Sequence, residues 1–326
     1  MKLLQSFCLL ILICAVSLSA FAANKPPTDA DGRPLIEKIG TVDCDMVETT
    51  PVVFNGRLYR FEYVRANYWN NKTGDSYFRF VDHETGEKTT PFAKGYDFGS
   101  AYVSDNTVYV TAVDEGDSEQ VYIFKSHDLE NWEQWMAFKL PGWGMFNTSM
   151  IKVKNKFVLM FEVGKPESEA GERFTARFAT SEDLKTWEIL SKDHNYARDR
   201  YTAPHCLRYF DGYYYDFYLE AFHGYEARVV RSKDLIHWEP SPLNPVLKAS
   251  PKDKQIANKS LPDSLIQKIA KADDWNNSDI DFCEYQGKLI INYSWGNQLG
   301  KEFLGEAVYH GTQEQFLKGW FPDNNV

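Results

Sequence analysis

Three side chains able to move protons stand where strand-like segments of the sequence begin. Glu48, His205 and Asp279 each precede or open a run rich in β-branched and aromatic residues. General acid–base catalysis of a hydrolysis needs one group that donates a proton and another that activates water. A neighbouring like charge can keep one carboxyl protonated, and a histidine donates protons near neutral pH. We therefore predict that Asp279, Glu48 and His205 are catalytic.

Each of these residues also has a plain structural interpretation. Asp279 and Asp281 alternate in NNSDIDF, so their side chains share one face of a strand, where aspartate is uncommon. They could instead fix a turn. Glu48 could be a solvated loop residue, and His205 a hydrogen-bonded histidine of the core. These alternatives stay open at the level of the sequence.

The elements that carry these residues form an internal repeat. Five segments each join two strand-like runs through a turn containing Gly or Asn, as two-residue hairpins require; they are residues 51–64, 101–113, 150–163, 206–219 and 282–295. Three of them continue into a third strand and then a Ser-x-Asp-Leu-x-x-Trp-Glu motif, at 126–133, 181–188 and 232–239. Ser and Asp can fix a turn through backbone amides, while Leu and Trp fill a gap between sheets, so we interpret the motif as structural.

Five four-stranded antiparallel sheets of this kind can bury both faces by packing around an axis. The predicted fold is all-β, a five-bladed β-propeller with blades near 48–93, 96–140, 146–192, 202–248 and 278–321. The fifth blade lacks an outer strand, which residues 35–40 of the N-terminal segment 23–47 could supply. The propeller domain, 48–326, contains an insertion at about 249–277, and its residues 260–272 have the apolar spacing of a short helix.

The segment TAPHCLRYFDGYYYDFY (202–218) resembles a blade-four segment of five-bladed propeller glycoside hydrolases, notably family 43. Families 32 and 117 share that architecture. TTPVVFNGRLYRF (49–61) is similar to the first-blade segment of the same group. The resemblance implies a carbohydrate substrate and glycosidase activity. It fails at two positions, since Thr202 stands where the family has its acid Glu and Thr50 where it has its base Asp.

Three functions follow from this departure. The first is an exported glycoside hydrolase acting on plant or algal oligo- or polysaccharides, exo-acting and inverting, with displaced catalytic residues. The second is a carbohydrate-binding propeller that has lost catalysis because of Thr50 and Thr202. The third, a protein-interaction propeller, is less favoured because it would need a broad flat aromatic face.

Propeller geometry places the start of each innermost strand and the end of the second strand at one funnel mouth. The starts offer Glu48, Asp97, Asn147, His205, Asp279 and Asp281, and the ends offer Arg65, Asn67, Glu162, Glu220, His223, Trp295, Asn297 and Gln298. From these and their neighbours we predict the substrate-binding residues Asp281, Asp97, Glu220, Arg200, Asn147, Trp143, Trp295 and Asn297. The alternatives are ion pairs for Asp97 and Glu220, charge balance with Asp199 for Arg200, and burial between blades for the tryptophans.

The N-terminal residues and the composition address location and partners. Residues 1–22 combine a lysine, an apolar run and an Ala20-Phe21-Ala22 cleavage site, which predicts a signal peptide and export to the periplasm or beyond. A net charge of −10 without basic runs disfavours nucleic acid and anionic membrane as partners. No membrane span is expected in the mature chain, and the sequence does not indicate an oligomeric state.

Cysteines and metals are less informative. Of the five cysteines, Cys44, Cys206 and Cys283 follow the signal peptide, and their odd number argues for buried residues with at most one disulfide. No cofactor is required. The oxygen-rich rim permits a structural calcium or magnesium ion at the axis, although no dedicated calcium loop is present.

Overall fold

The computed structural model describes residues 26–44, 46–66, 74–221 and 225–322. The expected signal peptide (residues 1–22) and the three residues after it lie outside these ranges. The funnel candidates Asn67 and His223 also lie outside them. Within them the chain forms nineteen strands and three short α-helices, so the all-β prediction is confirmed. None of these helices is long and apolar enough to cross a bilayer.

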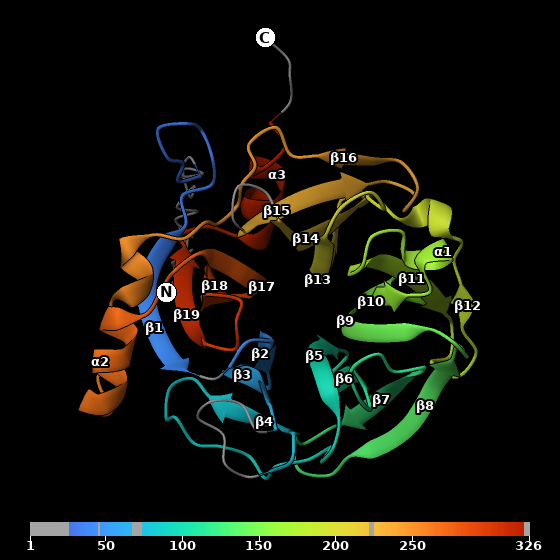
Figure 1. The fold of residues 1–326 in the computed structure, drawn as a ribbon, viewed down its shortest axis with the longest axis horizontal. Coiled ribbons are helices and arrows are strands. Elements are labelled where there is room, and N and C mark those ends of the chain that lie inside the picture. The colour runs from blue at the N-terminus through green and yellow to red at the C-terminus, as the bar shows by residue number, and fades with distance from the viewer. Residues whose placement is uncertain (1–25, 45, 67–73, 222–224, 323–326) are drawn as a thin grey trace, which may run out of the picture.

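Most strands pair antiparallel with their neighbours in the chain (Figure 1). The first sheet contains β2 (Thr49–Phe54), β3 (Arg57–Val64) and β4 (Tyr77–Asp82). The second contains β5 (Asp97–Ser104), β6 (Thr107–Val113), β7 (Gln120–Ser126) and β8 (Glu133–Lys139). The third contains β9 (Gly144–Val153), β10 (Lys156–Lys165), β11 (Thr175–Ser181) and β12 (Glu188–Ile189).

The remaining eight strands form one sheet made of two antiparallel groups. One group is β13 (Thr202–Phe210), β14 (Tyr213–Ala221), β15 (Tyr225–Ser232) and β16 (Trp238–Pro240). The other is β17 (Asn276–Tyr285), β18 (Lys288–Gly296), β19 (Glu302–Tyr309) and β1 (Glu37–Cys44). A single parallel residue pair, Tyr225 with Asn276, joins the two groups.

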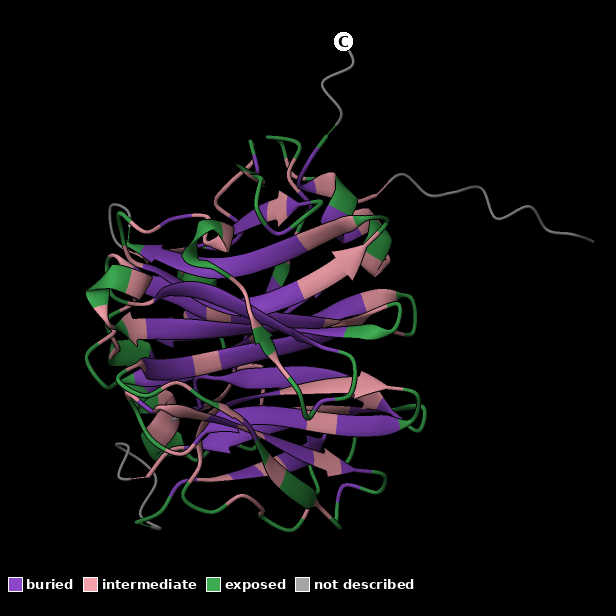
Figure 2. Ribbon diagram, turned by 90° about the vertical axis from the view of Figure 1, so that its right-hand side faces the viewer, coloured by how far each residue is buried: buried purple, intermediate pink, exposed green. Residues whose placement is uncertain are grey.

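The first strand of each group lies nearest the centre of the molecule (Figure 1). β2 contacts β5, β5 contacts β9, β9 contacts β13, β13 contacts β17, and β17 contacts β2. Side chains at equivalent ends of these strands therefore meet, although they are far apart in the sequence. Figure 2 shows that the strands are mostly buried along their length and that exposed residues concentrate in the connecting loops.

The first sheet differs from the expected four strands. The fourth segment runs beside β4 only through isolated bridges, Phe78 with Phe92 and Val81 with Lys88. Pro91 lies between the two bridges and has no amide hydrogen to donate, which explains why a continuous strand does not form.

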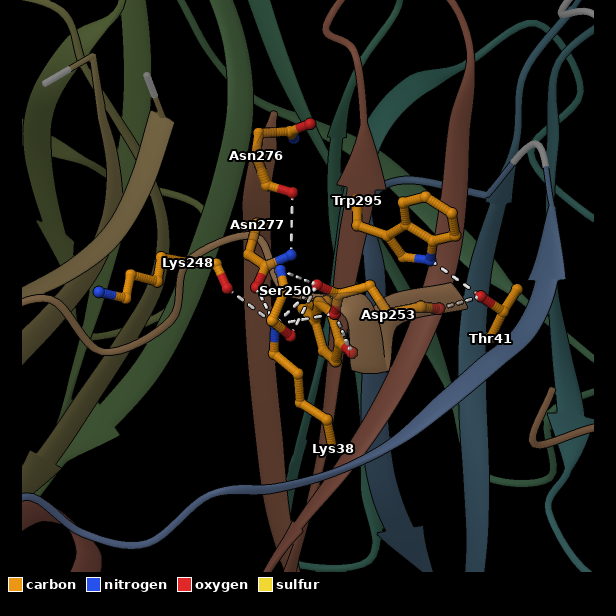
Figure 3. A network of polar contacts seen from close by, with 9 residues as sticks. Lys38, Thr41, Lys248, Ser250, Asp253, Asn276, Asn277 and Trp295 are labelled. Carbon is orange, nitrogen blue, oxygen red and sulfur yellow. Dashed lines mark hydrogen bonds and ion pairs between the residues drawn. The ribbon is translucent and has the colours of Figure 1, made fainter. Parts of the chain in front are cut away.

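The N-terminal strand β1 pairs antiparallel with β19. It also forms polar contacts with the insertion between β16 and β17. The buried ammonium group of Lys38 lies 2.8 Å from Asp253 Oδ1 and donates to Asn277 Oδ1 at 2.5 Å. Thr41 donates to the backbone oxygen of Asp253 at 2.6 Å (Figure 3). The insertion also contains α2 (Asp263–Lys271), on the outer side of β1 in Figure 1. The chain thus uses buried polar contacts to attach its first strand.

The repeated Ser-x-Asp-Leu-x-x-Trp-Glu motif is structural, as predicted. In the first copy, Ser126 Oγ accepts the amide of Leu129, and Asp128 Oδ1 accepts the amides of Glu130 and Asn131. The other two copies repeat the Asp contacts, and the leucine of each copy is buried with a positive φ. Two short helices, α1 (Glu167–Ala170) and α3 (Gln313–Gly319), complete the fold. The three described cysteines, Cys44, Cys206 and Cys283, form no disulfide.

Candidate functional site

A polar pocket of about 180 Å³ lies where several innermost strands begin. Its lining combines carboxyl groups, one arginine, amides and a tyrosine from four of the five strand groups; the polar members are Glu48, Arg65, Asn147, Glu162, Tyr201, Asp279, Gln298 and Glu302. Glu48, Asn147 and Asp279 are thus brought together as the sequence predicted. The volume corresponds to about six water molecules at roughly 30 Å³ each, a space suited to one sugar ring.

A β-bulge sets the backbone conformation of Asp279. The pairing of β17 with β18 shifts register between Ser278 and Asp281, and Asp279 has a φ of 50°, in the left-handed region. Such bulges redirect a side chain, and strained backbone of this kind is common at functional sites. Its Oδ2 accepts hydrogen bonds from Ser278 at 2.6 Å and Ser294 at 2.7 Å. The carboxylate is therefore held in one orientation.

His205 lies behind Asp279. Its Nδ1 is 3.6 Å from Asp279 Oδ1, and the residue is only 3% exposed. Neither ring nitrogen makes a hydrogen bond within the described part of the chain. His205 thus lies next to Asp279 but is not among the residues that line the pocket.

Glu48 forms a buried ion pair with Arg65, and both residues line the pocket. Burial raises the pKa of Glu48, the cation of Arg65 opposes this, and the charge of Asp279 adds to it. Glu48 Oε2 is buried and has no hydrogen-bond partner among the described residues. Asn147 Oδ1 is likewise unpartnered in the ranges that the structure describes. Two acceptors of the pocket are therefore left for a polar ligand.

Glu162 is the pocket residue best suited to donate a proton. It lies on β10 at a register shift against β9, and its Oε2 accepts a hydrogen bond from Asn147 Nδ2 at 2.6 Å. Burial raises its pKa to about 8; the bond from Asn147 opposes this, and the charges of Asp279 and Glu48 strengthen it. A carboxyl with this pKa is protonated at neutral pH.

Glu302, at the start of β19, also lines the pocket. Its Oε1 accepts the backbone amide of Gln298 at 2.6 Å. Burial raises its pKa to about 7; that hydrogen bond lowers it, and the charge of Asp279 raises it. The charge of Asp279 thus raises the pKa of Glu48, Glu162 and Glu302. The pocket lining contains four carboxyl groups and one arginine, Arg65.

Two other predicted aspartates lie away from the pocket. Asp281 is 1% exposed and pairs with Arg208, while its backbone neighbour Phe282 donates to it at 2.7 Å. The buried pair satisfies the charge of Asp281 within the core, and Asp281 does not line the pocket. Asp97 is half-buried and accepts the Tyr63 hydroxyl at 2.8 Å, and it does not line the pocket either.

Glu220 and Arg200 pair with each other, the alternative that the sequence left open. Arg200 Nε lies 3.3 Å from Glu220 Oε2, and Asp199 accepts from Arg200 at 2.8 Å. Tyr218 donates to Glu220 at 3.1 Å. Neither Glu220 nor Arg200 lines the pocket.

The predicted tryptophans and Asn297 are used for packing and turn formation. Trp295 has no exposed surface, donates its indole N–H to Thr41 at 2.9 Å and stacks on Phe303, so it cannot meet a sugar (Figure 3). Trp143 packs in the core beneath the Arg177 guanidinium, 4.8 Å from its ring centroid. Asn297 accepts the amide of Leu299 and shapes a loop from which Gln298, not Asn297, reaches the pocket.

The two threonines at the family's catalytic positions are buried. Thr202 has no exposed surface and directs its hydroxyl to the backbone of Ala197 at 3.5 Å. Thr50 accepts the amide of Ala101 at 3.3 Å and lines a separate cavity of about 330 Å³. Neither threonine lines the carboxyl-rich pocket.

Five polar pocket residues were not among the predicted site residues: Glu162, Glu302, Arg65, Tyr201 and Gln298. Three of these, Arg65, Glu162 and Gln298, stand at or just after the ends of second strands, so the funnel geometry offered them but gave no reason to choose them. Glu302 opens a third strand and Tyr201 precedes an innermost strand, so neither belonged to the positions searched.

Metal binding at the axis stays a prediction. In the four described ranges, no group of three His, Cys, Asp or Glu side chains has the arrangement of a metal site. Measuring activity and melting temperature before and after treatment with a chelator would test the expected calcium or magnesium ion.

Comparison with known proteins identifies the fold. No family model matches the sequence, and no curated protein matches it either. A solved structure of BT0996, described as an RGII complex, aligns with a TM-score of 0.57 at 13% identity, over 85% of this protein and 94% of that one. A glycosyl hydrolase from Bacteroides ovatus aligns at 0.55 and 12%, over 89% and 94%. A thermostable family-43 glycoside hydrolase aligns at 0.54 and 10%, over 82% and 90%. The resemblance to the family-43 fold is therefore confirmed.

Proposed function

We propose that this protein is a glycoside hydrolase whose five strand groups form the blades of a propeller, with its active site in the carboxyl-lined pocket. The observation that carries the proposal is that one pocket is lined both by Glu162, a buried carboxyl whose pKa is raised to about 8, and by Asp279, a carboxyl oriented by two serines. Both lie in a pocket of about 180 Å³ at the centre of the ring. Two carboxyl groups in different protonation states are the usual requirement for glycosidic bond cleavage.

In this mechanism Glu162 donates its proton to the leaving glycosidic oxygen. Asp279, held by Ser278 and Ser294, accepts a proton from the attacking water. Glu48 and Asn147 accept hydrogen bonds from sugar hydroxyls through their unpartnered oxygens. His205 maintains the position of Asp279. Direct attack by water inverts the anomeric configuration, in keeping with the sequence expectation.

The dimensions and charge of the pocket support exo action on a neutral sugar. A space suited to one ring favours a terminal residue. Even with Glu162 protonated, three carboxyl groups stand against a single arginine in the lining, which disfavours an anionic sugar at the reacting position. We also propose that the protein is exported by the predicted signal peptide. Its proposed substrate is a plant or algal oligo- or polysaccharide.

A screen of neutral oligosaccharides with the purified protein, read by mass spectrometry, tests the activity. We expect release of a single terminal sugar, and proton NMR of the first product should show the inverted anomer. Binding without products would instead support a carbohydrate-binding propeller. That second candidate is favoured by one observation, the threonines at both family positions, Thr50 and Thr202.

A further inference from the structure

A second cavity lies on the other side of the strand that carries Glu302. It measures about 620 Å³ and is bounded by α2, the residue after it and the start of β19. Three of its seven lining residues are lysines, Lys268, Lys271 and Lys301, and its floor includes Phe303. We refer to it as the lysine groove.

The lysine groove and the candidate active site share one short stretch of chain. Gly300 and Glu302 line the active-site pocket, while Lys301 and Phe303 line the groove. Alternate residues of an extended chain point to opposite sides, which explains this division. The two cavities therefore flank this stretch of chain.

The charges of the two cavities are opposite. Exposed lysine ammonium groups carry positive charge, and neither Lys271 nor Lys301 forms an ion pair with another described residue. Asp273 is exposed in the following segment but does not line the groove, and Glu302 faces the pocket. This local excess of positive charge stands out in a chain with a net charge of −10.

Helix geometry accounts for only part of the cluster. Lys268 and Lys271 lie in the last turn of α2, where lysines commonly meet the negative end of the helix dipole. Lys301 comes from the loop before β19 and has no such role. Its ammonium group adds to the positive charge of the lining, whose one aromatic residue, Phe303, is 3% exposed and stacks on Trp295.

We propose that the lysine groove binds an anionic part of the glycan whose neutral terminal sugar enters the pocket. The ligand class is a sugar chain that carries carboxylate or sulfate groups. The ammonium groups of the lysines attract such anions. The proposal that the ligand is a glycan rests on the proposed function; the proposal that it is an anion does not. The substrate would accordingly be a heteroglycan with neutral ends and acidic interior residues.

Calorimetric titration of the purified protein tests the proposal with four probes: an oligogalacturonate, a sulfated galactan oligosaccharide, a neutral galactan oligosaccharide of equal length and a DNA oligonucleotide of similar charge. The Lys271→Ala/Lys301→Ala protein is compared with Lys88→Ala/Lys233→Ala, which loses the same charge from exposed sites elsewhere. We expect the first variant to raise Kd for at least one anionic glycan about tenfold, as two exposed charge contacts allow. The control should stay within about twofold of the wild type, since exposed charges away from the groove contribute little.

The outcomes separate the groove from the activity. Preference for the oligogalacturonate identifies carboxylate as the anion, and preference for the sulfated chain identifies sulfate. Equal losses in both variants, or DNA bound as tightly as the best glycan, would overturn the proposal, because binding would then reflect charge alone. Lysine-dependent glycan binding without any cleavage would leave the groove assignment intact and remove the proposed activity. Cleavage of neutral glycans without any preference for anionic ones would support the proposed activity and overturn the groove assignment.

Discussion

The Nδ1 atom of His205 lies 3.6 Å from the Oδ1 atom of Asp279, bringing β13 and β17 together at the centre of the ring. The histidine is almost fully buried, so it meets Asp279 within the protein and not from the pocket. On the other oxygen, two serine hydroxyls hold the same carboxylate. Asp279 is therefore held on both oxygens, and its charge acts on the other three carboxyl groups of the pocket.

We expect Asp279→Asn to reduce kcat by about 10²–10⁴-fold, the usual contribution of a general base, because the amide cannot accept a proton from water. His205→Gln should reduce kcat by a smaller factor with little change in KM, since it only positions Asp279. Steady-state kinetics on the released sugar measure both. Full activity of Asp279→Asn on the true substrate would refute the site assignment.

Glu162→Gln should lower kcat/KM by about 10²–10⁴-fold for substrates with a poor leaving group. An activated aryl glycoside, whose leaving group needs no proton, should lose much less. The matched control is Glu130→Gln, an exposed glutamate of a motif turn, which should behave as the wild type. Equal losses on both kinds of substrate would exclude Glu162 as the proton donor.

The raised pKa of Glu162, about 8, predicts two pH effects. Activity should fall as pH rises through about 8, because the donor loses its proton. The folded state binds this proton more tightly than the unfolded chain, whose value is near 4.5, so the stability contributed falls as pH rises from about 4.5 to about 8. Melting curves of wild type and Glu162→Gln over this window measure the difference, which should be a shallower pH slope in the variant. If the loss of activity at alkaline pH persists in Glu302→Gln, the group that titrates is not Glu302, and Glu162 remains the proton donor.

Thr202→Val should leave activity within about threefold of the wild type. The side chain is fully buried, does not line the pocket, and its hydroxyl makes one long contact with Ala197 at 3.5 Å, worth about 1 kcal/mol or less of stability. Kinetics and a melting temperature check both statements. A hundredfold loss of activity in a folded protein would show that Thr202 takes part in the reaction.

Lys38→Met should destabilise the protein by about 3–5 kcal/mol, because it leaves Asp253 as an unpaired buried charge and loosens β1 from the insertion. Lys248→Met provides the control, since that side chain is exposed and only its backbone oxygen meets Lys38. Urea denaturation of the two variants compares them. Equal stabilities would mean that β1 is held by its pairing with β19 alone.

The sequence alone determined the all-β class of this protein and the hairpins that build its sheets. Two-residue turns, strand periodicity and the repeated Ser-x-Asp-Leu-x-x-Trp-Glu motif are local properties, and local hydrogen bonds reproduce them in the structure. The alignment of strand starts likewise brought Glu48, Asn147 and Asp279 to one pocket.

Only the tertiary structure decided which side chains face that pocket. Asp281 and Trp295 have the residue types of a sugar site, yet Arg208 and Thr41, distant in sequence, bind them within the core. Glu162 and Glu302 gained their high pKa values from burial and from the charge of Asp279. Burial and through-space charge depend on residues remote in the chain, so no local pattern of the sequence could have predicted them.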